Sequence, residues 1–459
     1  MTGFYCHLSS EIRQMSSSST SIDIEHLFKE LLKEVPHTMQ TTLREEMCIY
    51  HVPVHIRQVN EDAYTPQVIC IGPIHQKNEN QFMKDLKRRY FKQFLNRLPN
   101  VKGEQFQKEQ FQKELLSTIK DCEVEIRNCY EDDSFELCKD PKEFLKMIQW
   151  DVVFILELFL KTREFKEDSE DMSQDKYKYD CIIGKPWLRA AVQRDLILLE
   201  NQLPFWILDN LYKIATKYIK PDCSSFLNLT SDYFEEYNKK KINPPYILHF
   251  TYLVRLFLSS KHPTTIFTTP IIDCKTATRL EEAGMKFKPM PYECLLDIKA
   301  WSGGPGCNSI KKGELHVPTL EIDYHTECVL RNLMALEQCH FPKESFICQY
   351  VKFLDLLVDT AEDADLLIKS KIISNSLGKG AAVAELINEL CRGIVEVSSS
   401  KNNYSLLAEK LNDYSKNNYN KSKAFLRRQY FKNVWIGTGT VVGLIFLFIS
   451  LQDFVRSFL

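Results

Sequence analysis

Apolar residues recur at helical spacing along much of the chain, and few stretches alternate as strands do. Helical periodicity covers residues 24–32, 82–98, 106–130 and 190–214, the last interrupted by Pro204. A proline removes a backbone donor, so Pro204 should end or kink its helix. The pattern predicts a mainly α fold, with one large helical body and a few short strands.

One stretch, residues 144–159 (FLKMIQWDVVFILELF), is apolar nearly all round. A helix without a wet face belongs in the middle of a fold, so we expect this one to be buried. Two β-prone runs bounded by prolines, residues 48–53 and 68–71, predict extended segments against the helices. Polar composition predicts connecting segments at residues 161–179, 221–245 and 299–313, and a further helical stretch covers residues 326–391.

The last apolar stretch, residues 433–452 (NVWIGTGTVVGLIFLFISLQ), has no charged side chain. At about 1.5 Å per residue it covers about 30 Å, the thickness of a bilayer's hydrocarbon core. We therefore expect a single C-terminal transmembrane helix, with a buried core helix as the alternative. The predicted anchor includes Val434, Trp435, Gly439, Gly443 and Leu451. Gly439 and Gly443 form a GxxxG pair, which would allow a homodimer through this helix.

Charge around the predicted anchor suggests its orientation. Basic residues precede it at Lys421, Lys423, Arg427, Arg428 and Lys432. Because such a bias marks the cytosolic flank, we expect a tail-anchored, single-pass protein of the plasma membrane or endoplasmic reticulum with a cytosolic body. Glycosylation sequons at Asn228, Asn403 and Asn420 leave a lumenal body as the alternative.

These patterns divide the chain into four parts. We expect a polar leader with an N-terminal helix over residues 1–44, a helical body over 45–432, the anchor over 433–452, and a short tail over 453–459.

Composition then narrows the classes of function. A net charge of −2 and a pI near 6.6 argue against a nucleic-acid partner bound by phosphate neutralisation. Fifteen cysteines are scattered along the chain and never spaced as CxxC. Without a secretory signal, this usage predicts reduced and mostly buried thiols.

The most unusual polar cluster lies in residues 195–205, DLILLENQLPF. Glu200, Asn201 and Gln202 stand among leucines, so part of this trio must lie near the core. Buried polar side chains need hydrogen-bond partners, which predicts a structural polar network that includes Asp195. Such networks satisfy the backbone groups of loops or fix the packing of helices.

Glu337 and Gln338 repeat this pattern on a second helical stretch, and we assign them to the same kind of network. The alternative is an enzyme that uses Asp195, Glu200 or Glu337 as acid and base, because burial raises carboxylate pKa values. No nucleophile or phosphate cradle accompanies these residues in the sequence, so we predict no catalytic site.

Metal and cofactor motifs are incomplete. His325 and Cys328 stand one helical turn apart, and Cys339 precedes His340, but no second pair has zinc-site spacing. The glycine-rich loop at residues 302–313 lacks the GK[ST] ending of a phosphate loop. We therefore predict neither a bound metal nor a cofactor.

Several motifs in consistent order give the chain a family resemblance. They are CIYHVP at residue 48, IGPIH at 71, LKRRYFKQFL at 86, DVVFILELF at 151, RDLILLENQLPFWIL at 194, ATRLEEAGMKF at 277, VPTLEID at 317, LRNLMALEQ at 330 and YFKNVWIG at 430. The chain resembles the plant family of the domain of unknown function numbered 247 over about residues 45–455. It departs from that pattern at Val152, where glycine is usual, and at Val434, where proline is common.

The resemblance implies a membrane-associated plant protein with a mostly helical body, and it supplies no catalytic residues. Some relatives in grasses are linked to self-incompatibility. The leading interpretation is a membrane-anchored protein-interaction component in recognition or signalling, with an unknown protein partner besides the lipid bilayer. The alternatives are an enzyme with buried carboxylates in a helical cleft and an adaptor that dimerises through Gly439 and Gly443.

Overall fold

The stretch that is apolar all round forms the middle of α8 (Pro141–Asp168), the longest helix in the described part of the chain. The side chains of residues 152–156 have no exposed surface, as expected for a helix covered on every side. The computed structural model describes residues 46–98, 104–131, 138–168, 177–219, 225–259, 273–290, 294–300, 313–395, 404–418, 422, 425 and 434–456.

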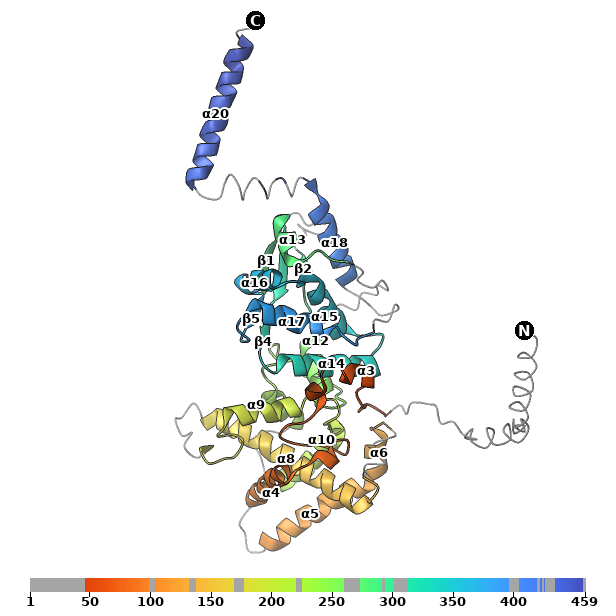
Figure 1. The fold of residues 1–459 in the computed structure, drawn as a ribbon. Helices are drawn as coiled ribbons and strands as arrows, with labels where there is room; N and C mark the ends of the chain where they lie inside the picture. The colour runs from red at the N-terminus through yellow and green to blue at the C-terminus, as the bar shows by residue number, and fades with distance from the viewer. Residues whose placement is uncertain are drawn as a thin grey trace, which may run out of the picture. The chain divides into compact units, whose positions relative to one another are not determined.

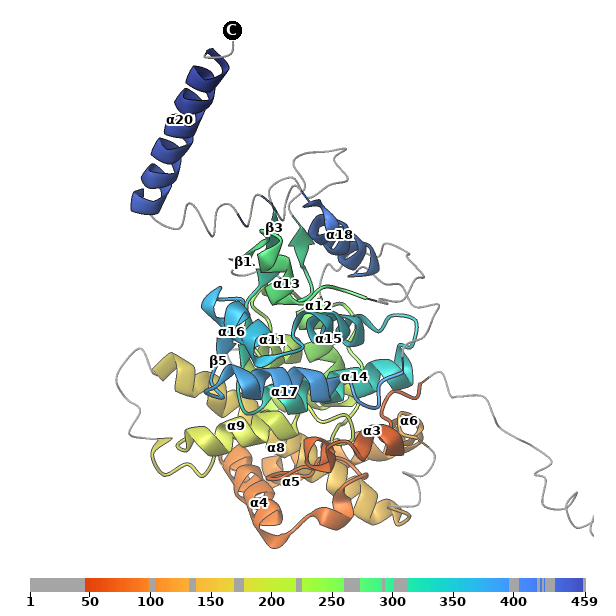
Figure 2. The same cartoon turned by 45° about the horizontal axis from the view of Figure 1, so that its top comes forward.

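Other helices of the first half pack around α8 (Figures 1 and 2). α4 (Gln81–Asn96), α5 (Glu104–Asp121) and α11 (Phe226–Tyr233) contact α8, and α10 (Phe205–Ile219) contacts α5. On the α11 side, the ring of Phe159 stacks on that of Tyr233 with centroids 4.2 Å apart. The remaining helices of this half are α3 (Val54–Arg57), η1 (Glu61–Tyr64), η2 (Gln76–Asn78), α6 (Glu123–Asn128), α9 (Pro186–Asp195) and α12 (Phe250–Ser259).

The strands are short and form two small sheets. β3 (Glu314–Pro318) lies between β1 (Lys286–Met290), to which it is parallel, and β2 (Lys299–Ala300), to which it is antiparallel. β4 (Leu320–Ile322) follows almost at once and pairs in parallel with β5 (Ile373–Asn375). The sheets are minor elements in a mainly helical body.

The second half of the body is also helical. α12 and α14 contact each other, and α14 packs against α15 and α17. A capping box begins α16: the Thr360 hydroxyl accepts the N–H of Asp363, whose carboxylate accepts the N–H of Thr360. The helices of this half are α13 (Ala277–Glu282), α14 (Thr326–His340), α15 (Phe346–Leu357), α16 (Ala361–Lys369), α17 (Gly380–Leu390), α18 (Tyr404–Lys416) and α20 (Val434–Arg456).

The predicted transmembrane anchor is wrong. Of the helices that the structure describes, none is both long enough and apolar enough to span a bilayer. The helix over this segment, α20, continues past residue 452 through Asp453 to Arg456. The residues reassigned from an anchor to α20 are Val434, Trp435, Gly439, Gly443 and Leu451.

Two of the predicted connecting segments contain helix. α8 extends to Asp168, and its charged last turns are supported by an ion pair between Arg163 and Glu167, with Nε and Oε1 2.9 Å apart. α11 lies within residues 221–245, where an apolar face too short for a clear sequence pattern is buried. Most of residues 299–313, and the helix predicted at residues 24–32, lie outside the described residues.

Candidate functional site

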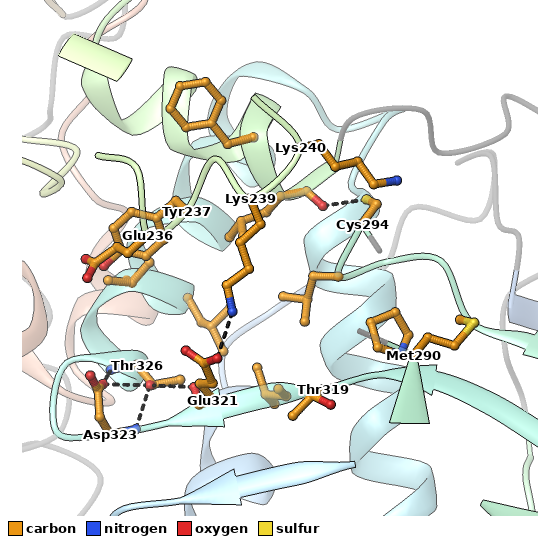
Figure 3. Close-up of a pocket in the computed structure, with 17 residues that line it drawn as sticks. Glu236, Tyr237, Lys239, Lys240, Met290, Cys294, Thr319, Glu321, Asp323 and Thr326 are labelled. Atoms are coloured by element: carbon orange, nitrogen blue, oxygen red, sulfur yellow. Dashed lines mark hydrogen bonds and ion pairs between the residues drawn. The ribbon is translucent and has the colours of Figure 1, made fainter. Parts of the chain in front are cut away.

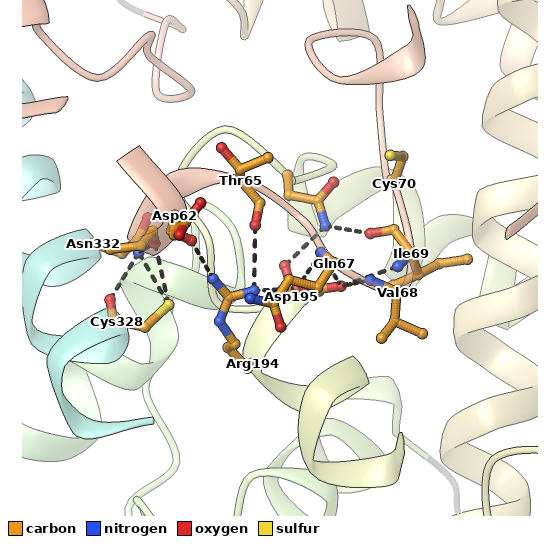
Figure 4. Close-up of polar contacts among 12 residues, drawn as sticks. Asp62, Thr65, Gln67, Val68, Ile69, Cys70, Arg194, Asp195, Cys328 and Asn332 are labelled. Atoms are coloured by element: carbon orange, nitrogen blue, oxygen red, sulfur yellow. Dashed lines mark hydrogen bonds and ion pairs between the residues drawn. The ribbon is translucent and has the colours of Figure 1, made fainter. Parts of the chain in front are cut away.

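Residues 68–71 are buried and Gln67 before them is exposed, but none of the five belongs to a strand of the described chain, so their backbone donors bond to side chains instead. Asp195, at the end of α9, is fully buried beside this segment (Figure 4). Its carboxylate accepts the N–H groups of Gln67 at 3.0 Å, Val68 at 2.6 Å and Ile69 at 3.0 Å. The carboxylate of Asp195 thus accepts the backbone N–H groups that a neighbouring strand would accept in a sheet.

The two amides of the predicted network complete this replacement. Asn201 accepts the N–H of Ile71 at 2.6 Å and donates to the carbonyl of Ile69 at 3.0 Å. Gln202 accepts the N–H of Phe250 at 2.9 Å and donates to the carbonyl of Leu198 at 2.8 Å. Asn201 therefore holds the buried segment, whereas Gln202 ties the α9–α10 connection to the start of α12.

Arg194 and Asn332 hold the residues just before this segment (Figure 4). The guanidinium of Arg194 donates to the carboxylate of Asp195 at 2.7 Å and to the carbonyl of Thr65 at 3.3 Å. Asn332, on α14, donates to the carbonyl of Ala63 at 2.8 Å and accepts the N–H of Leu199 at 2.9 Å. The network therefore joins the first half of the body to α14.

Glu200 binds a separate part of the chain. Its carboxylate accepts the N–H of Val52 at 2.6 Å, pairs with Arg57, and lies 3.0 Å from Nε2 of His75. Burial acts to raise the pKa of Glu200, but the hydrogen bonds from His75 and Arg57 outweigh burial and leave the pKa lowered. Glu200 is therefore held as a carboxylate beside the Arg57 guanidinium.

Glu337 and Gln338 lie at the end of α14. Glu337 is fully buried and accepts from Nε of Arg255 at 2.8 Å and from the N–H groups of Ile347 and Cys348 at 3.1 and 2.9 Å. Burial raises its pKa despite these partners. Gln338 is half-buried and accepts the N–H of Val395 at 3.0 Å.

These contacts limit what the carboxylates can do chemically. Burial raises the pKa of Asp195 against the effect of its backbone donors, but its oxygens are occupied by those donors. Neither Asp195, Glu200 nor Glu337 lines the apolar pocket between α12, α14 and β4. Nothing in their geometry indicates an acid and base facing a substrate.

Sequence reasoning missed a further buried carboxylate, Asp151, in the middle of α8. It accepts the N–H of Gly72 at 2.8 Å and pairs with Lys87. Gly72 has φ of +72°, and a Cβ there would lie 2.6 Å from the carbonyl oxygen of Gln202. The sequence does give a signal for this site: Asp151 is a charged residue in a stretch that is apolar nearly all round, and a fully buried charge needs partners.

Two of the His and Cys positions considered for metal binding, Cys328 and His340, form other contacts. The Cys328 thiol donates to the carbonyl of Ala63 at 3.2 Å, and Nδ1 of His340 lies 2.7 Å from the Tyr50 hydroxyl. Among the residues that the structure describes, no three His, Cys, Asp or Glu side chains gather closely enough to hold a metal. The cysteines in the same described ranges form no disulfide with one another.

A pocket of about 610 Å³ lies between α12, α14 and β4 (Figure 3). Its apolar lining includes Phe257 and Leu258 from α12 and Val329 and Leu330 from α14, together with Leu295. These side chains come from segments far apart in the sequence, so no local pattern could have revealed the pocket. It has the volume and the apolar walls of a ligand site.

Charged residues border this pocket. Nζ of Lys239 lies 2.8 Å from Oε1 of Glu321, and Figure 3 shows Lys239 reaching toward Glu321. Asp323 is held by the Thr326 hydroxyl at 2.8 Å. Both signs of charge are therefore available at the border of an apolar cavity.

The edge of β4 also borders the pocket. Leu320 donates to Ile372, and Ile322 accepts from Ser376, both at 2.9 Å, so these two residues face β5. Because successive residues of a strand direct their backbone groups to opposite edges, the N–H and carbonyl of Glu321 face away from β5. The Glu321 carbonyl accepts the Thr326 hydroxyl, at 3.3 Å, and the Glu321 N–H lies on the same outer edge.

A buried histidine ties the start of the body to α12. Nε2 of His249 lies 3.1 Å from the carbonyl of Cys48, and Nδ1 accepts the N–H of Tyr252 at 3.4 Å. This geometry requires the neutral ring with the proton on Nε2. Burial lowers the pKa of His249 to about 3.

Acid should therefore destabilise the protein through His249. The unfolded histidine takes up its proton near its ordinary pKa of about 6.5, while the folded one stays neutral, so stability is full above that pH and falls below it. We expect His249 to account for a loss of about 3 kcal/mol in the free energy of unfolding at about pH 4. Urea unfolding measured between about pH 7 and pH 4 should show this loss in the parent and a smaller loss in His249→Gln. If the free energy of unfolding fell equally with pH in both proteins, His249 would not be the cause.

Comparison with known sequences places the chain in a family. The profile of the DUF247 family, described as a plant protein of unknown function, matches residues 49–449, so the chain belongs to this family and the resemblance is confirmed. The chain is similar to a UPF0481 protein of Arabidopsis thaliana, 27% identical over 433 residues that cover 88% of this chain and 84% of that protein. A putative UPF0481 protein of the same plant is 25% identical over 115 residues, covering 25% of this chain and 20% of that protein. No solved structure gives a significant match.

Proposed function

We propose that this protein is an interaction component that recognises an extended segment of another protein. The observation that carries the proposal is the apolar pocket bordered by the outer edge of β4. An extended segment can pair with such an edge through its backbone while one or two of its side chains fill the pocket. The Arabidopsis relatives are named without an activity, so they neither add to nor limit this proposal.

The chemistry of the pocket supports a peptide with an apolar side chain. The walls formed by Phe257, Leu258, Val329 and Leu330 offer burial, which is the main favourable term in such binding. Lys239 and Glu321 are exposed at the border, so a partner charge of either sign can pair with one of them. Such pairs contribute more to specificity than to affinity.

An enzymatic function is not favoured by any observation on the described residues. The buried carboxylates that could act as acid or base accept hydrogen bonds from backbone groups and cations. A protein that only binds a partner does not need a carboxylate that is free to act as acid or base.

The test uses two substitutions at one position. Glu321→Pro removes the N–H that faces away from β5, leaving the β4–β5 bonds in place, whereas Glu321→Ala removes only the side chain. Random displayed peptides are first selected on the immobilised full chain. We expect Glu321→Pro to weaken the selected peptides about tenfold, the value of one lost backbone hydrogen bond, and Glu321→Ala to have a smaller effect.

Unfolding curves of both variants check that the body stays folded. The proposal is wrong if selection on the parent enriches no peptide family, or if every enriched family binds the folded proline variant as tightly as the parent.

A further inference from the structure

The turn between α8 and α9, residues 177–185, is held in one shape by a buried carboxylate. Asp180 is fixed by donors from three parts of the chain. They are the Tyr90 hydroxyl at 2.7 Å, the N–H groups of Ile182 and Ile183 at 2.9 Å each, and Nζ of Lys161 at 2.5 Å. The donors from α4 and α8 fasten the turn to the helical body.

Gly184 closes this turn. A Cβ at this position would lie 2.5 Å from the carbonyl oxygen of Tyr177 and 3.0 Å from that of Lys178. Only glycine therefore permits the backbone to pass so close to the start of the turn. With Asp180 and Gly184 both in place, the residues on the outer side of the turn are presented by a fixed backbone.

That outer side carries aromatic rings and cations exposed to solvent. The side chain of Tyr179 is 89% exposed, and that of Trp187, in the first turn of α9, is 67% exposed. Lys178 and Lys185 are exposed beside them. Large rings on a rigid backbone are the residues that most often dominate binding energy at protein interfaces.

α4 adds further positive charge to the same region. The bond between Tyr90 and Asp180 brings the neighbouring Arg89 close to the turn; burial raises the pKa of Cys181, and the charge of Arg89 acts to lower it. Lys92, one helical turn further along α4, is also exposed. Within the described ranges, neither Arg89, Lys92 nor Lys185 forms an ion pair.

From this arrangement we infer a second recognition surface, formed by Arg89, Lys92, Lys178, Tyr179, Lys185 and Trp187, that binds an acidic segment of a partner protein. It is separate from the β4 pocket and does not rest on the function proposed there. Carboxylates of the partner pair with the cations, and its apolar groups cover the two rings. The charges are complementary, and the fixed turn lowers the entropy cost of ordering the surface.

The arrangement favours an acidic protein segment over a nucleic acid or an anionic membrane as the partner. A nucleic acid or an anionic membrane is attracted by a dense field of positive charge, whereas this chain has a net charge of −2. The cations here are spread over the turn and α4, and the two exposed rings lie on the turn and at the start of α9. Such spacing matches carboxylates placed one by one along a polypeptide.

The surface is tested with the full chain and a displayed library of random peptides. Selection on the parent should enrich peptides rich in Asp and Glu with interspersed apolar residues. The double reversal Arg89→Glu with Lys178→Glu, and separately Tyr179→Ala with Trp187→Ala, should each weaken these peptides at least about tenfold. The matched control, Lys343→Glu with Lys369→Glu, makes the same charge change at two exposed lysines outside the surface and should retain binding within about threefold.

The outcomes separate this inference from the function proposed for the pocket. Acidic peptides that bind Glu321→Pro normally but not the double reversal support it. It is overturned if no acidic family is enriched, or if the acidic peptides bind the folded double reversal as tightly as the parent. It is also overturned if phosphatidylserine vesicles or a DNA duplex, and not the peptides, bind through these six residues.

Discussion

Replacement of Asp195 with alanine is expected to lower the free energy of unfolding by about 4 kcal/mol. The carboxylate is fully buried and accepts three consecutive N–H groups, from Gln67, Val68 and Ile69. Its loss would leave the N–H groups of Val68 and Ile69 and the Arg194 guanidinium without this acceptor in a place that water does not reach. Urea unfolding followed by circular dichroism measures the loss.

Two variants make this expectation specific to the buried acceptor. Asp195→Asn keeps one acceptor oxygen, so it should cost about half as much as the alanine variant. Asp413→Ala removes an exposed carboxylate from α18 and should change stability by no more than about 0.5 kcal/mol. If Asp195→Ala were as mild as Asp413→Ala, the carboxylate would not be holding the buried segment.

Replacement of Arg255 with methionine is expected to lower the free energy of unfolding by about 3 kcal/mol. Arg255 and Glu337 form an ion pair whose side chains are 4% and 0% exposed. The variant would leave a buried carboxylate without its cation, and the stacking of the guanidinium over Phe341, 4.4 Å from the ring centroid, would also be lost. The same unfolding assay measures this change.

The matched control is the exposed pair of Arg392 and Glu389, with side chains 66% and 42% exposed. Arg392→Met should cost at most about 0.5 kcal/mol, because solvent screens such pairs. Adding Glu337→Gln to Arg255→Met should recover about 1–2 kcal/mol, since the remaining buried group is then neutral. Additive losses from the two changes would argue that the pair is not coupled.

The two proposed recognition surfaces rest on the same kind of construction. At the pocket, an edge of β4 is fixed by its pairing with β5; at the turn before α9, Asp180 and Gly184 fix the backbone. Each surface is a short segment whose backbone is fixed by the elements beside it. Binding residues are often placed on loops that a rigid scaffold positions in this way.

Some of this architecture could be read from the sequence. The all-round apolar pattern of residues 144–159 correctly predicted the buried core of α8. The polar cluster at residues 195–202 indicated side chains that need partners, and the structure shows hydrogen bonds for each of them. The identity of those partners could not be predicted, because Asp195 and Val68 are 127 positions apart.

The predicted anchor shows how a composition argument fails. Twenty residues without charge, about the length that crosses a hydrocarbon core, predicted a membrane span over residues 433–452. The helix that forms there continues to Arg456, and no helix in the described ranges has the length and apolar character for a crossing.

The sequence by itself determined the mainly helical class, the identity of the central buried helix and the family, because periodicity and motif order are local properties of the chain. Tertiary structure decided which backbone groups the buried side chains hold, where the pocket opens, and how the turn at residues 177–185 meets α4. These features depend on contacts between segments far apart in sequence, and no local pattern specifies which distant segments will meet.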